Sequence, residues 1–110
     1  MRNLLLALLF LLPTTGWCHS KVVATEPINE TVLDKPPAVV KITFNKAIEP
    51  HFNQAELKVN QQWVTLTSSV KDKTLMIPLE KNDLKQYQIR WSVISQDGHR
   101  ERGLLKFSIK

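Results

Sequence analysis

The chain has 110 residues, 43% of them hydrophobic, which is enough for one domain with a single core. Its formal net charge is +5, but the lysines and arginines are scattered, without interleaved aromatic residues or a basic helix, so nucleic-acid binding is not expected. The only cysteine is Cys18. The residues after it therefore contain no disulfide and no thiolate metal site.

The first residues have the pattern of a secretory signal peptide. Arg2 supplies the positive charge that precedes the apolar segment, and Leu4–Leu12 is an unbroken apolar run. This run is far shorter than the ~20 residues that a membrane-spanning helix needs. We therefore expect a cleaved signal and no transmembrane segment in the mature chain.

The cleavage site is expected after Cys18, because signal peptidase requires small residues at −3 and −1, and Gly16 and Cys18 occupy those positions. This divides the chain into a signal peptide, residues 1–18, and a domain, residues 19–110. The mature protein then begins with His19. Cleavage after Gly16 and lipid attachment at Cys18 are the two alternatives, the second disfavoured by the bulky residue before the cysteine.

The domain consists of short segments in which apolar and polar residues alternate, as in half-buried strands. Seven segments have this pattern, at residues 21–25, 38–45, 57–59, 63–67, 75–79, 87–94 and 105–109. Residues 26–31 are expected to form a turn, and residues 49–51 are expected to end the second strand. Pro78 indicates an edge strand or a strand end for its segment.

The clearest strand is predicted at residues 87–94. Tyr87, Ile89, Trp91 and Val93 lie on one face of it, so we assign Trp91 to the core. Tyr87 follows Asn82–Gln86, a segment that resembles the approach to a tyrosine corner, in which a tyrosine hydroxyl bonds to upstream backbone. An ordinary core tyrosine is the alternative.

Seven short strands, with turns at intervals of ~8–12 residues, predict an all-β immunoglobulin-like Greek-key β-sandwich or barrel. No segment keeps a helical apolar period over three turns. The fold class indicates no activity by itself.

Asp97-Gly98-His99 directly follows the clearest strand and carries two potential metal ligands. Residues at i and i+2 of an extended chain point to the same side, but two ligands are too few for a closed site. His19 at the mature N-terminus would add its α-amine and its imidazole. This nitrogen-rich set suits Cu(II). Met76 is the only methionine after the signal, so no sulfur cluster for Cu(I) is expected.

The run from Tyr87 to His99, followed by Gly103 and Phe107, resembles the CopC-type periplasmic copper-resistance proteins, as does the mature start at His19. The resemblance covers essentially the whole domain. It implies an immunoglobulin-like fold and one Cu(II) ion per chain, bound by His19, Asp97 and His99. It also implies a copper carrier in the periplasm, without catalytic activity, acting beside a CopD-like inner-membrane protein.

Two other functions compete with this hypothesis. A terminal histidine with a second histidine also resembles the copper site of oxygenases, but so small a domain offers no evident substrate surface. The other alternative is a metal-independent β-sandwich that binds a protein. His51 follows Pro50 in a predicted turn; its role is left open between a further ligand and a solvated side chain.

Overall fold

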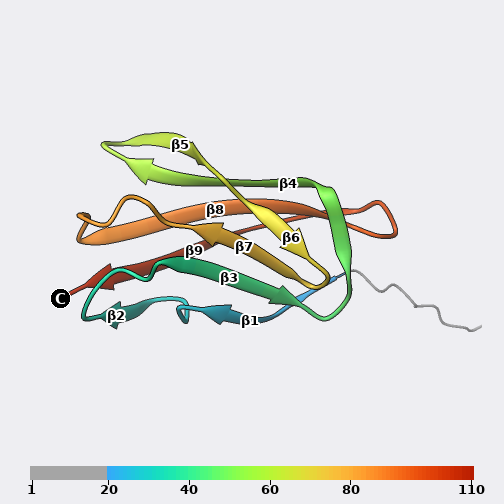
Figure 1. The fold of residues 1–110 in the computed structure, drawn as a ribbon, viewed down its shortest axis with the longest axis horizontal. Coiled ribbons are helices and arrows are strands. Elements are labelled where there is room, and N and C mark those ends of the chain that lie inside the picture. The colour runs from blue at the N-terminus through green and yellow to red at the C-terminus, as the bar shows by residue number, and fades with distance from the viewer. Residues whose placement is uncertain (1–19) are drawn as a thin grey trace, which may run out of the picture.

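The computed structural model describes residues 20–110, which form two β-sheets packed face to face (Figure 1). The four-stranded sheet contains, in spatial order, β1 (Val22–Glu26), β3 (Val39–Phe44), β7 (Thr74–Pro78) and β6 (Ser69–Lys71). The five-stranded sheet contains, in spatial order, β2 (Thr31–Leu33), β9 (Arg100–Ile109), β8 (Gln86–Ser95), β4 (Ile48–Val59) and β5 (Gln62–Leu66). Within these residues, no helix is long and apolar enough to cross a membrane. The predicted all-β sandwich is confirmed.

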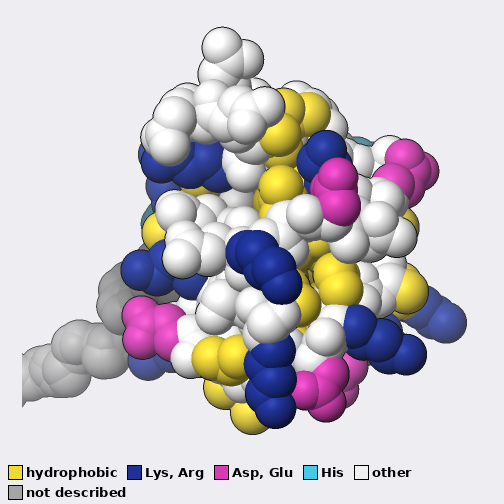
Figure 2. Space-filling view, turned by 90° about the vertical axis from the view of Figure 1, so that its left-hand side faces the viewer, with side chains coloured by type: hydrophobic (Ala, Val, Ile, Leu, Met, Phe, Trp, Pro, Cys, Tyr) yellow, Lys and Arg dark blue, Asp and Glu magenta, His cyan; other side chains and the backbone are white. Residues whose placement is uncertain are grey.

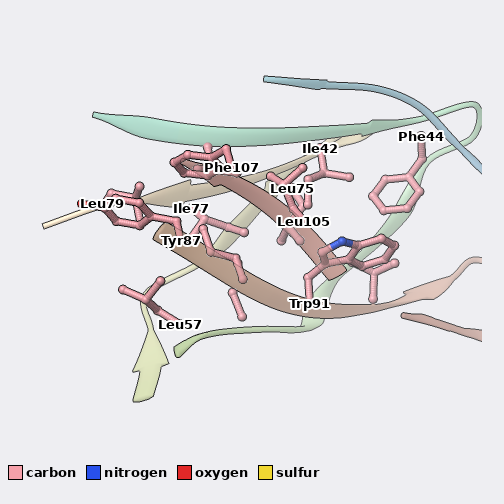
Figure 3. Close-up of a cluster of buried hydrophobic side chains, with 14 of the residues drawn as sticks. Ile42, Phe44, Leu57, Leu75, Ile77, Leu79, Tyr87, Trp91, Leu105 and Phe107 are labelled. Atoms are coloured by element: carbon pink, nitrogen blue, oxygen red, sulfur yellow. The ribbon is translucent and has the colours of Figure 1, made fainter. Parts of the chain in front are cut away.

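The core lies between the two sheets and is built from the alternating apolar residues of β3, β4, β7, β8 and β9. Trp91 occupies the predicted place in it, with its ring edge-to-face against Phe44 at a centroid distance of 5.3 Å (Figure 3). Gly103 on β9 faces Trp91, and a Cβ atom there would lie 2.5 Å from Trp91 Cζ2. The indole therefore requires glycine at this position.

Tyr87 forms a tyrosine corner at the start of β8. Its hydroxyl donates to the Lys81 carbonyl oxygen at 2.9 Å and lies 3.4 Å from the Leu84 amide nitrogen, which donates to it. Its ring is fully buried and stacks on Phe107, with centroids 4.9 Å apart. The predicted tyrosine corner is confirmed: Tyr87 is a core residue whose hydroxyl fixes the preceding turn.

All seven predicted strands have counterparts, and residues 20–110 contain two more, β2 and β6, of three residues each. β2 pairs in parallel with β9, and β6 pairs with β7. The turn predicted at residues 26–31 lies between β1 and β2 but is shorter, because Glu26 ends β1 and Thr31 begins β2. Pro78 is the last residue of β7, which confirms the strand-end prediction. The edge prediction is wrong, because β7 lies between β3 and β6.

The prediction that residues 49–51 end a strand is also wrong, because these residues lie within β4. The pairing of β4 with β8 is irregular between Ile48 and Asn53. Such an irregularity accommodates Pro50, which has no N–H to donate to the ladder. The irregularity also breaks the alternation of apolar residues, so the first half of β4 cannot be recognised as a strand from the sequence.

The two ends of the sandwich differ. The C-terminus lies at one end, where Lys and Arg side chains are interspersed with acidic, polar and hydrophobic ones (Figure 2). The tip of the β8–β9 hairpin and the start of the described chain lie at the opposite end (Figure 1). That second end carries the candidate site.

Candidate metal centre

The hairpin between β8 and β9 holds Asp97 and His99 in a short, fixed loop. The Ser95 amide donates to the His99 carbonyl oxygen at 2.8 Å, and the Gly98 amide donates to the Ser95 carbonyl oxygen at 2.9 Å. Gly98 has φ +92°, a left-handed conformation that side chains disfavour. Glycine between the two candidate ligands is therefore a requirement of the turn.

Asp97 and His99 are brought into direct contact. Asp97 Oδ1 lies 3.2 Å from His99 Nδ1, and it accepts a hydrogen bond from the His99 amide at 3.3 Å. The Ser95 hydroxyl donates to the same oxygen. The side chains of Asp97 and His99 are 42% and 54% exposed, so an ion from solvent can reach both. The two side chains are adjacent, as the sequence predicted, but a turn at Gly98 brings them together and not the extended backbone on which the prediction rested.

The hydrogen bond from Ser95, with further contributions from His99, lowers the pKa of Asp97 to about 2. These donors favour the ionised form more than the opposing desolvation disfavours it. At neutral pH the carboxylate is therefore fully ionised. A cation can bind to it without displacing a proton.

The first described residue packs against this hairpin. Ser20 is only 2% exposed, and Lys21 is held in place by Asn45: the Lys21 amide donates to Asn45 Oδ1 at 2.8 Å and the Asn45 amide to the Lys21 carbonyl oxygen at 2.9 Å. Ser20 shares a hollow of about 240 Å³ with Lys46, Ala47, Ser95, Gln96 and Asp97. The N-terminal segment and the hairpin therefore meet, although they are far apart in sequence.

The predicted ligand His19 lies outside the described residues. Among those that are described, no group of three or more His, Cys, Asp or Glu side chains converges on one point. The structure thus brings Asp97 and His99 together and does not add His51 to them. His51 is exposed, in the irregular part of β4.

Sequence reasoning missed two residues of this region, Ser95 and Ser20. Ser95 stands two positions before Asp97, a spacing at which serine and aspartate side chains commonly bond within a turn, so that signal was available. Ser20 Oγ is buried and has no hydrogen-bond partner in the part of the chain that the structure describes. No local pattern marks a serine as buried beside a hairpin that lies more than 70 residues away.

Comparison with known proteins identifies a family. The model of the CopC domain matches residues 22–110. The copper transport protein CutJ of Bacillus subtilis is 30% identical over 112 residues, covering 96% of this chain, which spans only 21% of CutJ. Protein YobA of Escherichia coli K12 is 28% identical, with 86% of this chain and 81% of YobA covered.

Solved structures show the same fold. CopC from Methylosinus trichosporium OB3b superposes with a TM-score of 0.74 at 20% identity, covering 84% of this chain and 94% of that one. PcoC from Escherichia coli, described as a methionine-rich copper resistance protein, has a TM-score of 0.69 at 18% identity, with 84% and 100% covered. The chain belongs to the CopC domain family.

Proposed function

We propose that the exported protein is a periplasmic carrier that binds one Cu(II) ion through His19, Asp97 and His99. The observation that carries this proposal is that the buried Ser20 lines the same hollow as Ser95, Gln96 and Asp97 of the hairpin. The start of the described domain thus lies at the hairpin, which supports a site that combines the N-terminal residue with Asp97 and His99. The relatives named for copper transport and copper resistance support the choice of metal.

The donor atoms suit Cu(II). The α-amine and imidazole of His19, the imidazole of His99 and a carboxylate oxygen of Asp97 form the nitrogen- and oxygen-rich set that tetragonal Cu(II) prefers. Asp97 Oδ1 takes the contacts from Ser95 and His99, so Oδ2 is the oxygen we assign to the ion. The contact between Asp97 Oδ1 and His99 Nδ1 places the carboxylate beside that ring nitrogen, so an ion that replaces the contact can bind both groups, through Oδ2 and Nδ1.

Export completes the site. While the signal peptide is attached, the nitrogen of His19 belongs to a peptide bond and is a poor ligand. Cleavage after Cys18 converts it into an amine with a pKa of ~7.7–8.0. The protein would therefore acquire its full copper affinity only after leaving the cytoplasm. We further propose that copper passes between this carrier and a CopD-like inner-membrane protein.

The test is Cu(II) titration of the processed protein, whose intact mass verifies that it starts at His19. Asp97→Ala and His99→Ala should each weaken binding by about 100-fold or more, because even residues that only orient a ligand contribute about 10–100-fold. The matched controls are Asp83→Ala and His51→Ala. Asp83 is an exposed carboxylate that pairs with Lys81 instead of a candidate ligand, and both controls should leave the affinity unchanged.

Equal affinity in Asp97→Ala, His99→Ala and the parent protein would contradict the site and favour a metal-independent module. Peroxide-driven turnover by the copper-loaded protein would instead indicate an oxygenase. Loss of binding in the two site variants alone, without turnover, is the result expected of a carrier.

A further inference from the structure

A hollow of about 500 Å³ lies on the outer face of the five-stranded sheet. Ser92 on β8 is at its floor, because Trp91 and Val93 on either side point into the core. The side chains around it include Glu56, Arg90, Arg100, Arg102 and Leu104. We call these six residues the arginine hollow. The role of Asp97 and His99 in copper binding does not use it.

Arg90 forms a fixed and neutralised wall of the hollow. Its Nε lies 2.5 Å from Glu56 Oε1, and its guanidinium carbon lies 4.2 Å from the centre of the Trp63 ring. The Glu56 carboxylate and the indole face hold the guanidinium in one orientation. The charge of Arg90 is thus already compensated within the protein.

Arg100 and Arg102 differ from Arg90 because neither forms an ion pair with a carboxylate among the described residues. Arg100 donates to the Ser92 hydroxyl at 3.4 Å, while Arg102 makes no hydrogen bond or ion pair within residues 20–110. Glu101 stands between them in sequence, and strand alternation directs it to the opposite face of β9. The hollow therefore presents two positive guanidinium groups on one face, and within residues 20–110 neither of them is paired with a carboxylate.

We propose that the arginine hollow is a docking surface for an extended acidic segment of a protein partner. Guanidinium groups bind carboxylates through two parallel hydrogen bonds. Residues two apart on a strand are separated by ~6.6–6.8 Å. This is also the separation of side chains two apart on an extended acidic segment, so two of its carboxylates match Arg100 and Arg102. Leu104, 47% exposed, adds an apolar contact.

Because of where the hollow lies, docking there would affect the exchange of copper. Arg100 directly follows His99, so a partner seated on Arg100 and Arg102 lies next to the Asp97–His99 hairpin. The partner would then be placed for exchange of the ion. This consequence depends on the proposed copper site, whereas the docking itself does not.

The test uses metal-free processed protein labelled with ¹⁵N, so that its result is independent of copper binding. The probe is the blocked peptide Glu-Thr-Glu-Thr-Glu, with Gln-Thr-Gln-Thr-Gln and inorganic phosphate as comparisons. The acidic peptide should shift the amide signals of Ser92, Arg102 and Leu104 saturably, and added salt should weaken it. Arg100→Gln/Arg102→Gln should reduce its affinity by at least about 10-fold.

The control is Lys71→Gln/Lys73→Gln, which removes two exposed cations that are also two positions apart in sequence, at the β6–β7 turn of the four-stranded sheet. It should change the affinity by less than about 2-fold, the size expected of a distant surface charge. An equal loss in both double variants, or equal binding of the glutamine peptide, would overturn the proposal. Phosphate that competes with the acidic peptide at equal concentration would show a small-anion site and would overturn it too.

Discussion

The two ends of strand β8 carry the same kind of contact, a side chain that is hydrogen-bonded to the backbone of a turn, with different consequences. At its start, the Tyr87 hydroxyl bonds to the backbone of the turn before it. Just beyond its end, the Asp97 carboxylate accepts from the backbone amide of His99. Each side chain fixes a turn. Tyr87 is fully buried, however, whereas Asp97 is 42% exposed.

Burial decides what each contact contributes. A buried hydroxyl that bonds to the backbone stabilises the fold, because a broken bond leaves the hydroxyl unsatisfied inside the protein. An exposed carboxylate can exchange its partners for water, so its loss costs the fold little. The carboxylate oxygens and their negative charge then remain available for binding a ligand. The Tyr87 end is therefore expected to control stability, and the Asp97 end to control copper binding.

The largest effect on stability is expected for Tyr87→Ala, which should lower the free energy of unfolding by about 3–5 kcal/mol. Tyr87→Phe keeps the ring and removes only the hydroxyl, so it should cost about 0.5–1.5 kcal/mol. Urea unfolding of the processed protein measures both. Copper affinity of the folded Tyr87→Phe protein should equal that of the parent, and a large loss would show that the two ends are coupled.

A smaller loss is expected at Gly103, which lies between the two ends. In Gly103→Ala the new methyl group would meet the Trp91 ring at 2.5 Å, so the indole must shift at a cost of about 1–3 kcal/mol. Differential scanning calorimetry would detect this as a lowered Tm. A Tm equal to that of the parent would mean that the core beneath β9 is looser than its packing indicates.

The smallest effect on stability is expected for Asp97→Asn, because the side chain is exposed and its contacts are screened by solvent. The pKa of Asp97, lowered from 3.8 to about 2, gives the sign of its pH dependence. The carboxylate stabilises the folded state above pH 3.8, and this contribution is lost as the pH falls through 2. The free energies of unfolding of Asp97→Asn and of the parent protein, measured between pH 2 and 7, should therefore become equal only near pH 2.

Most of the fold could be predicted because its strands alternate strictly. β3, β7 and β8 bury every second residue, and that period is visible in the sequence. The first half of β9 is not visible, because Gly103 replaces an apolar inward residue to make room for Trp91. β2 and β6 are too short to show a period.

The candidate site was predictable only where its residues are close together in the sequence. Asp97 and His99 are close in sequence, and the turn at Gly98 brings their side chains into contact. The approach of Ser20 to their hairpin depends on how the whole sandwich closes. That contact comes from the tertiary structure, since neither segment carries a local pattern that predicts the other.

The most direct test of the copper site is to add one glycine before His19 of the processed protein. The extra residue converts the α-amine of His19 into an amide and leaves its imidazole, Asp97 and His99 intact. A Cu(II) titration followed by electron paramagnetic resonance should then show an affinity lower by about 100-fold or more and an altered set of nitrogen ligands. An unchanged affinity and spectrum would contradict the N-terminal chelate and, with it, the proposal that export completes the site.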